Sequence, residues 1–373
     1  MGLQQKNKHI IICGGGTGGH IFPAISIANA LKEIDPDVDL LFVGARNKIE
    51  MTVVPEAGYM IKGLPISAFH RSLSFKNILF IFKLIKSLFL AGKIIKQFKP
   101  DVVLGVGGFA SGPVMKMATW EKIPSFIQEQ NSFPGVTNRL LAKKAEKIFV
   151  AYDQMEKYFQ ADKIVFTGNP VRQDLENIEN LKNEAIEYFE FNKSKKTIFF
   201  FGGSQGARII NQSIISKIDL IKKSDVQIIW QTGKFFFEKA KQIIKEKEII
   251  NINIFEFISR MDLAYSIADL VVCRAGAGTI SELCLTGKPA ILVPFALAAG
   301  DHQKKNAMAL VEKGAAKMLY EKQAEENLIN DAIEIIKDEK QLGRMADNII
   351  KLKKENSAKN IAKQILNFIE KKD

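Results

Sequence analysis

Short unbroken runs of apolar residues recur along this chain, and segments with a helical period separate them. In the N-terminal part the runs lie at 9–14, 39–44, 101–108, 125–129 and 147–151, and helical segments lie at 23–34 and 73–98. Runs that do not alternate apolar with polar residues are typical of strands buried on both faces of a parallel sheet. The first part of the chain is therefore predicted to be a layered α/β domain.

The same pattern starts again near residue 197. Apolar runs follow at 197–203, 226–233, 252–257, 268–276 and 289–295, with helices between them, the first at 206–220. We therefore predict an α/β chain with two doubly wound, Rossmann-like domains, residues 1–168 and 169–350. The domains meet at "FTGNPVR" (166–172), which precedes an acidic segment at 173–193 that we expect to be helical.

The C-terminal segment has the pattern of an amphipathic helix at 350–370. Ile361, Ile365, Leu366 and Ile369 fall on one face of that helix. An apolar face needs a partner, so we expect residues 351–373 to pack back on the first domain.

The composition is that of a soluble globular protein, since 47% of the 373 residues are hydrophobic and 25% are charged. No uninterrupted apolar stretch reaches about 18 residues, and the N-terminus lacks a signal-peptide core and a myristoylation signal. We therefore expect the chain in the cytoplasm. Cys13, Cys273 and Cys284 show no metal-ligand spacing, so we expect reduced, mostly buried thiols.

The net charge of +12 indicates an anionic partner. Nucleic acid, an anionic membrane face and a phosphorylated substrate are the three candidates. The chain shows no recognised DNA- or RNA-binding motif, and its lysines are spread over both halves. We therefore expect no nucleic-acid partner.

The helix predicted at 73–98 bears on the membrane hypothesis. One face carries apolar residues that we expect in the core: Ile78, Ile81, Phe82, Ile85, Leu88 and Phe89. A second arc carries Lys76, Lys83, Lys86 and Lys93, with Leu79 and Phe80 near them. Cations interleaved with exposed apolar residues are typical of helices that bind an anionic lipid surface. The alternative is a solvated basic face on an ordinary helix.

Glycine-rich loops follow several predicted strands, at 13–19, 105–113, 202–208 and 274–282. Such a loop at a helix N-terminus offers N–H groups and a positive dipole end to an anion. Gly14, Gly16 and Gly19 satisfy the spacing GxGxxG, which alone is a weak signal. A nicotinamide site also needs an acidic residue at the end of the second strand, and "LLFVGAR" (40–46) has none. This argues against an NAD-dependent oxidoreductase and favours a sugar- and phosphate-rich ligand in a cleft between the domains.

The sequence predicts no resident metal and no tightly bound cofactor. The aspartates at 35–39 precede a strand, at the wrong end of a parallel sheet for a site, and no His/Cys/Asp cluster appears. A free Mg²⁺ could still accompany a diphosphate. In the fourth loop, Thr279 is expected to begin a helix and Glu282 to lie one turn in. Glu282 either accepts hydrogen bonds from sugar hydroxyls or only complements the helix dipole.

The order of these motifs carries a specific resemblance. "GGTGGHIFPA", "GVGGFASGP", "QEQNSFPGVTNRLLAKKA", "GNPVR", "GGSQGAR" and "CRAGAGTISEL" followed by "GKPAILVPF" and "DHQKKNA" occur as in the MurG family, over nearly the whole chain. The resemblance implies a GT-B fold and an inverting transfer of N-acetylglucosamine from UDP-GlcNAc to undecaprenyl-linked muramyl-pentapeptide (lipid I), which yields lipid II. It also implies a peripheral position on the cytoplasmic face of the inner membrane, with possible partners among cell-wall synthesis proteins.

The resemblance also implies roles for individual residues. On the acceptor side it implies Thr17, Gly18, Gly19 and Asn131. For UDP-GlcNAc it implies Arg172, Ser204, Ile258, Ala277, Gly278, Thr279, Ile280, Ser281, Glu282 and Gln303. Glu282 would bind the ribose, and Ile258 would touch the uracil through its backbone. Some relatives carry a bulkier residue where Gly278 stands, which puts the fine donor contacts in doubt.

An inverting transfer needs a base for the attacking hydroxyl and charge stabilisation for the leaving diphosphate. His20, at the mouth of the first glycine loop, is the leading candidate for the base. Its alternative role is to hydrogen-bond a phosphate or cap the helix. Glu129 is the rival base, and its alternative role is that of a buried carboxylate that orients loop backbone. His302 would support the donor pocket, while His9 and His70 are taken as incidental. A related GT-B enzyme that glycosylates diacylglycerol is the alternative function.

Overall fold

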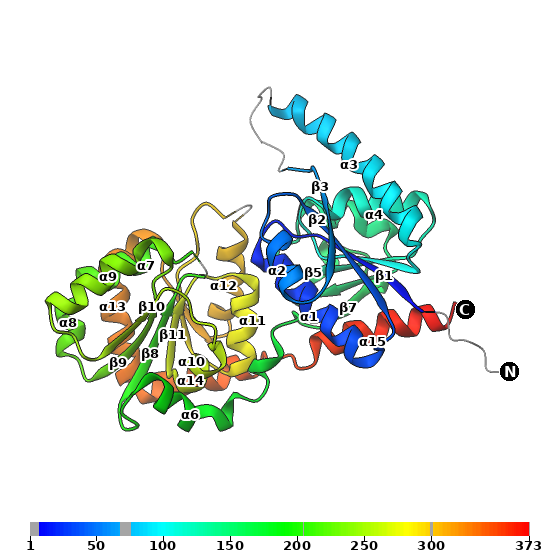
Figure 1. The fold of residues 1–373 in the computed structure, drawn as a ribbon. Coiled ribbons are helices and arrows are strands. Elements are labelled where there is room, and N and C mark those ends of the chain that lie inside the picture. The colour runs from blue at the N-terminus through cyan, green and yellow to red at the C-terminus, as the bar shows by residue number, and fades with distance from the viewer. Residues whose placement is uncertain (1–6, 68–75, 204, 299–300, 373) are drawn as a thin grey trace. The chain divides into compact units, whose positions relative to one another are not determined.

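The computed structural model describes residues 7–67, 76–203, 205–298 and 301–372. The chain forms two compact units (Figure 1). Unit 1 contains the residues up to Arg172 together with the segment from Asn356 onward, and unit 2 runs from Gln173 to Glu355. Each unit is an α/β layer structure built on a parallel sheet.

In unit 1 the described residues form a seven-stranded sheet in the order β3-β2-β1-β4-β5-β6-β7. Its strands are β1 (His9–Cys13), β2 (Asp39–Ala45), β3 (Met60–Leu64), β4 (Val102–Gly105), β5 (Ser125–Glu129), β6 (Lys147–Val150) and β7 (Ile164–Phe166). Every pairing is parallel, and Ile11 of β1 lies opposite Leu41 and Val103. The strand order reverses between β1 and β4, the position at which ligands bind in doubly wound sheets.

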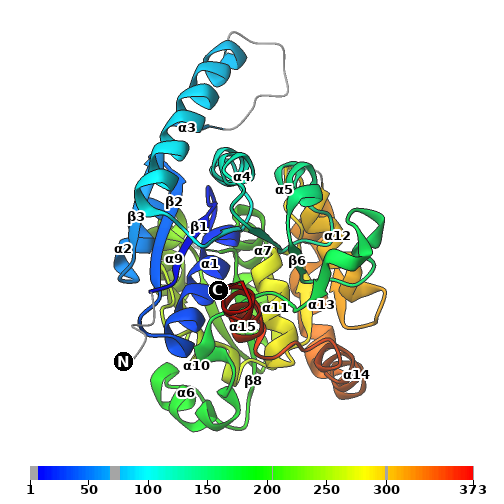
Figure 2. The ribbon, with the colours of Figure 1, turned by 90° about the vertical axis from the view of Figure 1, so that its right-hand side faces the viewer.

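Helices cover both faces of this sheet. On one face lie α1 (Gly18–Ile34), α2 (Glu50–Glu56) and α15 (Ser357–Glu370); on the other lie α3 (Lys76–Phe98), α4 (Ser111–Trp120) and α5 (Val136–Leu141). Figure 2 shows α15 beside α1, with which it packs. The predicted apolar face of the C-terminal helix is confirmed, because Ile361, Ile365, Leu366 and Ile369 are buried in the core of unit 1. Short 3₁₀ helices occupy Ala142–Lys144, Met155–Lys157 and Ala161–Lys163.

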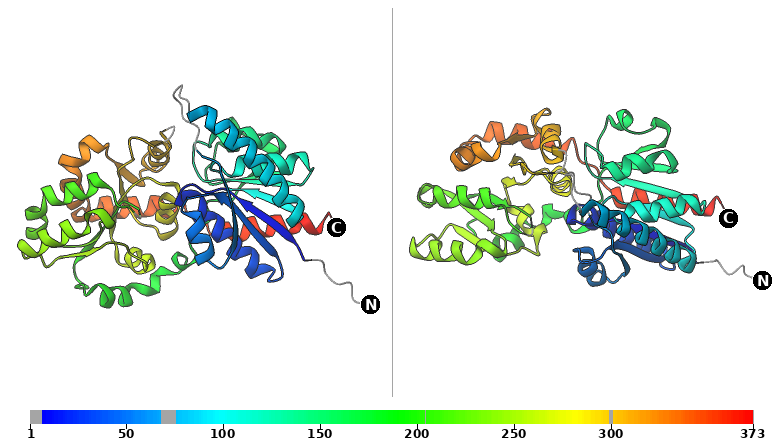
Figure 3. Two further views of the ribbon diagram at one scale, coloured as in Figure 1. Left: turned by 45° about the horizontal axis from the view of Figure 1, so that its top comes forward. Right: turned by 90° about the horizontal axis from the view of Figure 1, so that it is seen from above.

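The described part of unit 2 contains a six-stranded parallel sheet in the order β10-β9-β8-β11-β12-β13. The strands are β8 (Lys196–Phe201), β9 (Val226–Gln231), β10 (Ile252–Phe255), β11 (Leu270–Cys273), β12 (Ala290–Leu292) and β13 (Ala316–Met318). The helices are α6 (Lys182–Phe189), α7 (Arg208–Ser216), α8 (Ile218–Lys223), α9 (Lys234–Glu246), α10 (Met261–Ile267), α11 (Ala277–Thr286), α12 (His302–Val311), α13 (Glu321–Lys337) and α14 (Glu339–Ile350). They line both sides of the sheet, as Figure 3 shows.

Three strands are absent from the sequence prediction: β3, β7 and β13. Each is an edge strand of its sheet. β3 alternates exposed with partly buried residues instead of forming an unbroken apolar run. An edge strand has only one strand neighbour and often one wetter face, so the pattern of a fully buried strand does not find it.

Several predicted helix limits are also corrected. α1 begins at Gly18, five residues before the predicted start at residue 23, because two glycines disguise its first turn. The helix expected at 206–220 is two helices, α7 and α8. The segment 173–193 begins with 3₁₀ helices at Gln173–Leu175 and Ile178–Leu181, and only α6 within it is α-helical. α15 begins at Ser357, later than the predicted residue 350.

The face of α3 that we predicted to lie in the core is largely exposed. Ile81, Phe82, Ile85 and Phe89, which we expected in the core, are 55%, 67%, 59% and 75% exposed. The core face instead carries Ala91, Ile94 and Ile95, with Phe80 and Leu84 packed against the same core. Lys86 and Lys93 share the exposed arc with the apolar residues. Residues 73–75 and the side chains of Lys76, Ile78 and Leu79 lie outside the described part of the chain.

All three cysteines are buried and free of disulfides, as predicted. Burial raises the pKa of each thiol, that of Cys284 to about 12. A thiol that stays protonated is a poor nucleophile, so none of the three is a candidate for covalent catalysis.

Candidate active site

Three N–H groups of the first glycine loop donate to other segments of the protein. Gly14 donates to the carbonyl of Val43 and Gly15 to that of Gly107, over 3.1 and 3.2 Å. Gly16 donates to the Glu50 carboxylate over 2.9 Å. The expectation that the loop at 13–19 offers its N–H groups to an anion is therefore wrong for residues 14–16.

The glycines serve close packing between the loops that follow β1 and β4. A Cβ on Gly14 would lie 2.4 Å from the Gly107 carbonyl oxygen, and one on Gly108 would lie 2.1 Å from that of Gly15. Gly14, Gly15 and Gly16 also have positive φ angles of 148°, 124° and 91°. Glycine is required here because two backbones meet and because the chain takes a conformation that side chains disfavour.

The next three residues form the start of α1. Thr17 is the extended N-cap of α1, and Gly18 and Gly19 form the first turn of this helix. The N–H groups at the start of a helix have no intrahelical acceptor and lie at the positive end of its dipole. The acceptor-side role that the resemblance implies for Thr17, Gly18 and Gly19 stays a prediction.

His20 lies in the first turn of α1 at the reversal of strand order. Its Nδ1 is 3.0 Å from the Thr17 hydroxyl, and its ring lies against Gly107, where a Cβ would be 3.0 Å from Nε2. The side chain is partly exposed. His20 is therefore a partly accessible imidazole held by both glycine loops.

Glu129 ends β5 as a buried carboxylate, 1% exposed. Its Oε1 accepts from the backbone and side-chain N–H groups of Asn131, at 3.0 and 3.2 Å. Its Oε2 accepts from the Gly135 N–H at 3.0 Å and from Asn138 Nδ2 at 2.9 Å. Burial raises the pKa of Glu129, and these N–H groups oppose that rise. The arrangement orients the 131–135 loop, the alternative role considered from the sequence.

A prediction follows for Glu129→Gln. The glutamine NH₂ would face at least one of the four N–H donors, so we expect the free energy of unfolding to fall by about 1–3 kcal/mol. Displacement of Asn131 should also lower turnover. Chemical denaturation and steady-state kinetics measure the two effects, with exposed Glu146→Gln as the control. Loss of turnover at unchanged stability would instead favour Glu129 as a base.

A buried amide network joins the "EQN" and "GNPVR" motifs. Asn169 Nδ2 donates to the Gln130 carbonyl at 2.9 Å, and Gln128 Nε2 donates to Asn169 Oδ1 at 3.0 Å. Gln130 Nε2 donates to the Val106 carbonyl at 2.8 Å. The network ties the segments after β4, β5 and β7 together. Arg172, the residue at which the chain leaves unit 1 for unit 2, is exposed just beyond it.

Unit 2 repeats the packing of one glycine loop against a second backbone segment. A Cβ on Gly206 would lie 2.1 Å from the Thr232 carbonyl oxygen, and one on Gly233 would lie 2.4 Å from that of Gln205. Asn211 Nδ2 donates to the Thr232 carbonyl at 2.8 Å. Ser204, which the resemblance assigned to the donor, lies outside the described residues.

The fourth loop leads into α11, whose N-cap is Gly276. The helix begins at Ala277, not at Thr279, and its first turn contains no acidic residue. The alternative that Glu282 is a first-turn dipole partner is therefore wrong. The Tyr265 hydroxyl donates to Glu282 Oε2 at 3.0 Å and orients the carboxylate. A Cβ on Gly278 would meet no atom within 4 Å, so a bulkier residue fits at this position.

The remaining donor candidates also follow strands of unit 2. Ile258 lies after β10, is 3% exposed, and its N–H donates to Gln231 Oε1 at 2.9 Å. Gln303, in the first turn of α12, accepts from the Phe295 N–H at 2.9 Å. Because the carboxyl ends of parallel strands meet at one edge, these residues share that edge with α11. The stretch Ala277, Gly278, Thr279, Ile280 and Ser281 lies at the same edge.

Two buried polar residues were missed from the sequence: Glu50 and Gln231. Gln231 Nε2 donates to the Gly203 carbonyl at 3.0 Å, so its side chain bridges the third glycine loop and Ile258. Glu50 lies beyond the stretch "LLFVGAR" (40–46) that ends the second strand, so the strand-end pattern does not include it. The sequence signal for both residues is a polar side chain close to the end of a strand. That signal does not show which backbone groups the side chain will bind.

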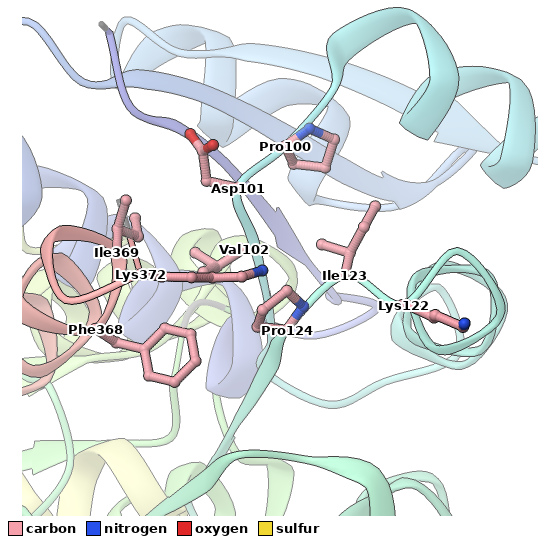
Figure 4. A pocket seen from close by; sticks show the side chains of 9 residues that line it. All are labelled: Pro100, Asp101, Val102, Lys122, Ile123, Pro124, Phe368, Ile369 and Lys372. Carbon is pink, nitrogen blue, oxygen red and sulfur yellow. The ribbon is translucent and has the colours of Figure 1, made fainter. Parts of the chain in front are cut away.

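A pocket of about 220 Å³ lies at the opposite end of the unit 1 sheet (Figure 4). It is lined by residues 100–102 and 122–124 and by Phe368, Ile369 and Lys372. These residues adjoin the amino ends of β4 and β5, away from the glycine loops. The pocket is therefore separate from the candidate site.

Known glycosyltransferases resemble both units. Residues 10–150 match the glycosyltransferase family 28 N-terminal domain, and residues 197–365 match the glycosyltransferase family 28 C-terminal domain. The crystal structure of MurG from Acinetobacter baumannii has a TM-score of 0.77 at 26% identity, covering 96% of this chain and 99% of that one. Together with the two parallel sheets, these matches define a glycosyltransferase with the GT-B fold.

Full-length relatives narrow the assignment. The UDP-N-acetylglucosamine--N-acetylmuramyl-(pentapeptide) pyrophosphoryl-undecaprenol N-acetylglucosamine transferase of Parabacteroides distasonis is 54% identical, covering 99% of this chain and 100% of that protein. The protein of the same name from Phocaeicola vulgatus is 52% identical, with 98% of each chain covered. The chain therefore belongs to this transferase family, the MurG family.

Proposed function

We propose that this chain transfers N-acetylglucosamine from UDP-GlcNAc to the muramyl 4-hydroxyl of lipid I, giving lipid II for peptidoglycan synthesis. The observation that carries the proposal is the 54% identity with the Parabacteroides distasonis transferase over 99% of the chain. Purified protein with radiolabelled UDP-GlcNAc and a short-chain lipid I analogue tests it. A parallel assay with diacylglycerol as the acceptor tests the alternative function, glycosylation of diacylglycerol. Label found only in a glycosylated diacylglycerol would overturn the proposal.

In the proposed mechanism His20 takes the proton from the attacking hydroxyl. If Nδ1–H donates to the Thr17 hydroxyl, the neutral ring carries on Nε2 the lone pair that a base needs. Glu129 is the weaker candidate, since both of its oxygens already accept hydrogen bonds from loop N–H groups. Its proposed role is to hold Asn131 in place on the acceptor side.

The leaving diphosphate is proposed to be stabilised by backbone N–H groups at the start of α11 and by Arg172. Helix N-termini favour anions through free N–H groups and the helix dipole. This donor set needs no resident metal, and a free Mg²⁺ would bind the diphosphate rather than the protein. Turnover measured after adding EDTA tests this part of the proposal. We expect turnover to persist, because no protein-bound ion is needed.

A prediction for donor binding concerns Glu282→Gln. Glutamine can still accept the Tyr265 hydroxyl, so the fold should be retained. The glutamine amide is a weaker acceptor for ribose hydroxyls than the carboxylate. A hydrogen bond to a charged group contributes about 1.5–3 kcal/mol. Its loss should raise the KM for UDP-GlcNAc about 10- to 100-fold. Steady-state kinetics at saturating acceptor measure it, with exposed Glu312→Gln as the control. An unchanged KM would remove Glu282 from the ribose site.

We further propose that unit 1 binds the anionic membrane surface through α3, on the cytoplasmic face of the inner membrane. No helix in the described part of the chain is long and apolar enough to cross a bilayer. The exposed arc of α3 combines Ile81, Phe82, Ile85 and Phe89 with Lys86 and Lys93. Apolar side chains that enter the lipid interface and lysines that face anionic headgroups are the two elements of such binding. Figure 1 shows α3 beside α4.

A further inference from the structure

Glu50 is a buried carboxylate to which the proposed mechanism assigns no role. It is 0% exposed and lies at the first position of α2. Its Oε2 accepts from the Gly16 N–H and its Oε1 from the Ala45 N–H, each at 2.9 Å. The side chain therefore connects the loop after β1 to the end of β2.

Two glycines leave the space that this side chain occupies. A Cβ on Gly15 would lie 2.5 Å from Glu50 Cδ, and one on Gly44 would lie 2.5 Å from Glu50 Cγ. The carboxylate thus fills a socket walled by backbone. It occupies the position in which a glycine loop at the start of a helix commonly holds a bound anion.

We propose that Glu50 is a positioning residue for the glycosyl transfer, acting through the first glycine loop on Thr17 and His20. This rests on the proposed function. Three consecutive glycines have no side chains that could fix their conformation, and glycine loses the most conformational freedom on ordering. The bond from Gly16 to Glu50 restrains the residue that directly precedes Thr17, whose hydroxyl contacts His20 Nδ1.

The occupied socket also limits where the acceptor binds. A second anion at the Gly16 N–H would meet the Glu50 carboxylate, and like charges in a buried site repel strongly. The acceptor diphosphate is therefore assigned to the N–H groups of Thr17, Gly18 and Gly19. Residues 14–16 do not contact the acceptor in this proposal; they position Thr17 and His20.

The test compares Glu50→Gln and Glu50→Ala with exposed Glu56→Gln, which lies on the same helix. Misplacing a reacting group by about 1 Å can cost on the order of 100-fold, so we expect kcat to fall 10- to 100-fold in Glu50→Gln. The KM for UDP-GlcNAc should stay within about twofold, because the donor candidates after Arg172 belong to unit 2. Glu56→Gln should match wild type.

A double-variant cycle separates positioning from general loss of structure. In a His20→Ala background, Glu50→Gln should cost little further, because residues that act through one another are not additive. The same fold loss in both backgrounds would overturn the proposal, as would a kcat near wild type in Glu50→Gln. Acetate should restore part of the rate of Glu50→Ala by refilling the socket, whereas chloride at equal ionic strength should not.

Amide hydrogen exchange provides a readout that does not depend on activity. The Gly16 amide should exchange faster in Glu50→Ala than in wild type or Glu56→Gln. Unchanged protection of this amide would contradict the claim that Glu50 restrains the loop. If wild type makes no lipid II, the proposed function is wrong, but this result does not decide the role of Glu50. The exchange result still decides whether Glu50 holds the loop.

Discussion

His20→Ala is expected to lower kcat for lipid II formation by about 10²- to 10⁴-fold, the usual contribution of a positioned general base. The imidazole lies in the first turn of α1, with Nδ1 at the Thr17 hydroxyl and its ring against Gly107. Truncation removes the proton acceptor without opening the core, because the side chain is partly exposed. Turnover of radiolabelled UDP-GlcNAc with a soluble lipid I analogue measures the effect.

Two controls make the His20 result specific. UDP binding, followed by calorimetry, should remain at the wild-type level, since the predicted nucleotide contacts after Arg172 come from unit 2. His9→Ala alters an imidazole at the opposite end of β1, which contacts the Phe98 carbonyl, and should retain turnover. Normal turnover in His20→Ala would place the base elsewhere, with Glu129 as the next residue to test.

The second large effect is expected for Phe82→Ser combined with Phe89→Ser. Both side chains are mostly exposed on α3 and pack on no core cluster in the described residues. Burying one Phe in an apolar medium contributes about 1.5–3 kcal/mol, so losing two should weaken binding to anionic vesicles by about 10²- to 10⁴-fold. Vesicle sedimentation measures this change directly.

The membrane variant should separate binding from catalysis. With a short-chain acceptor in solution, kcat should stay near wild type, whereas activity on full-length lipid I in vesicles should fall. Phe235→Ser combined with Ile250→Ser removes side chains of unit 2 that are 86% and 96% exposed, and serves as a matched control. Equal vesicle binding by the α3 variant and this control would contradict the role of α3.

Glu129 shows why residue type alone does not determine role. A Glu at the end of a buried strand is a reasonable base, and the sequence left this role open beside a structural one. The four N–H groups around its carboxylate come from the loop that follows it in the sequence and, through Asn138, from α5. Local spacing did not specify that the loop folds back onto this side chain.

The sequence by itself determined the α/β class, the two domains, most central strands and the location of the glycine loops, because buried parallel strands and glycine turns are local signals. Only the tertiary structure decided which face of α3 is exposed. An amphipathic pattern identifies an apolar face but not whether protein or lipid will cover it. The tertiary structure also decided that Gly14, Gly15 and Gly16 pack against Gly107, Gly108 and Glu50 rather than against a ligand. Those partners are far apart in sequence, and folding alone brings them together.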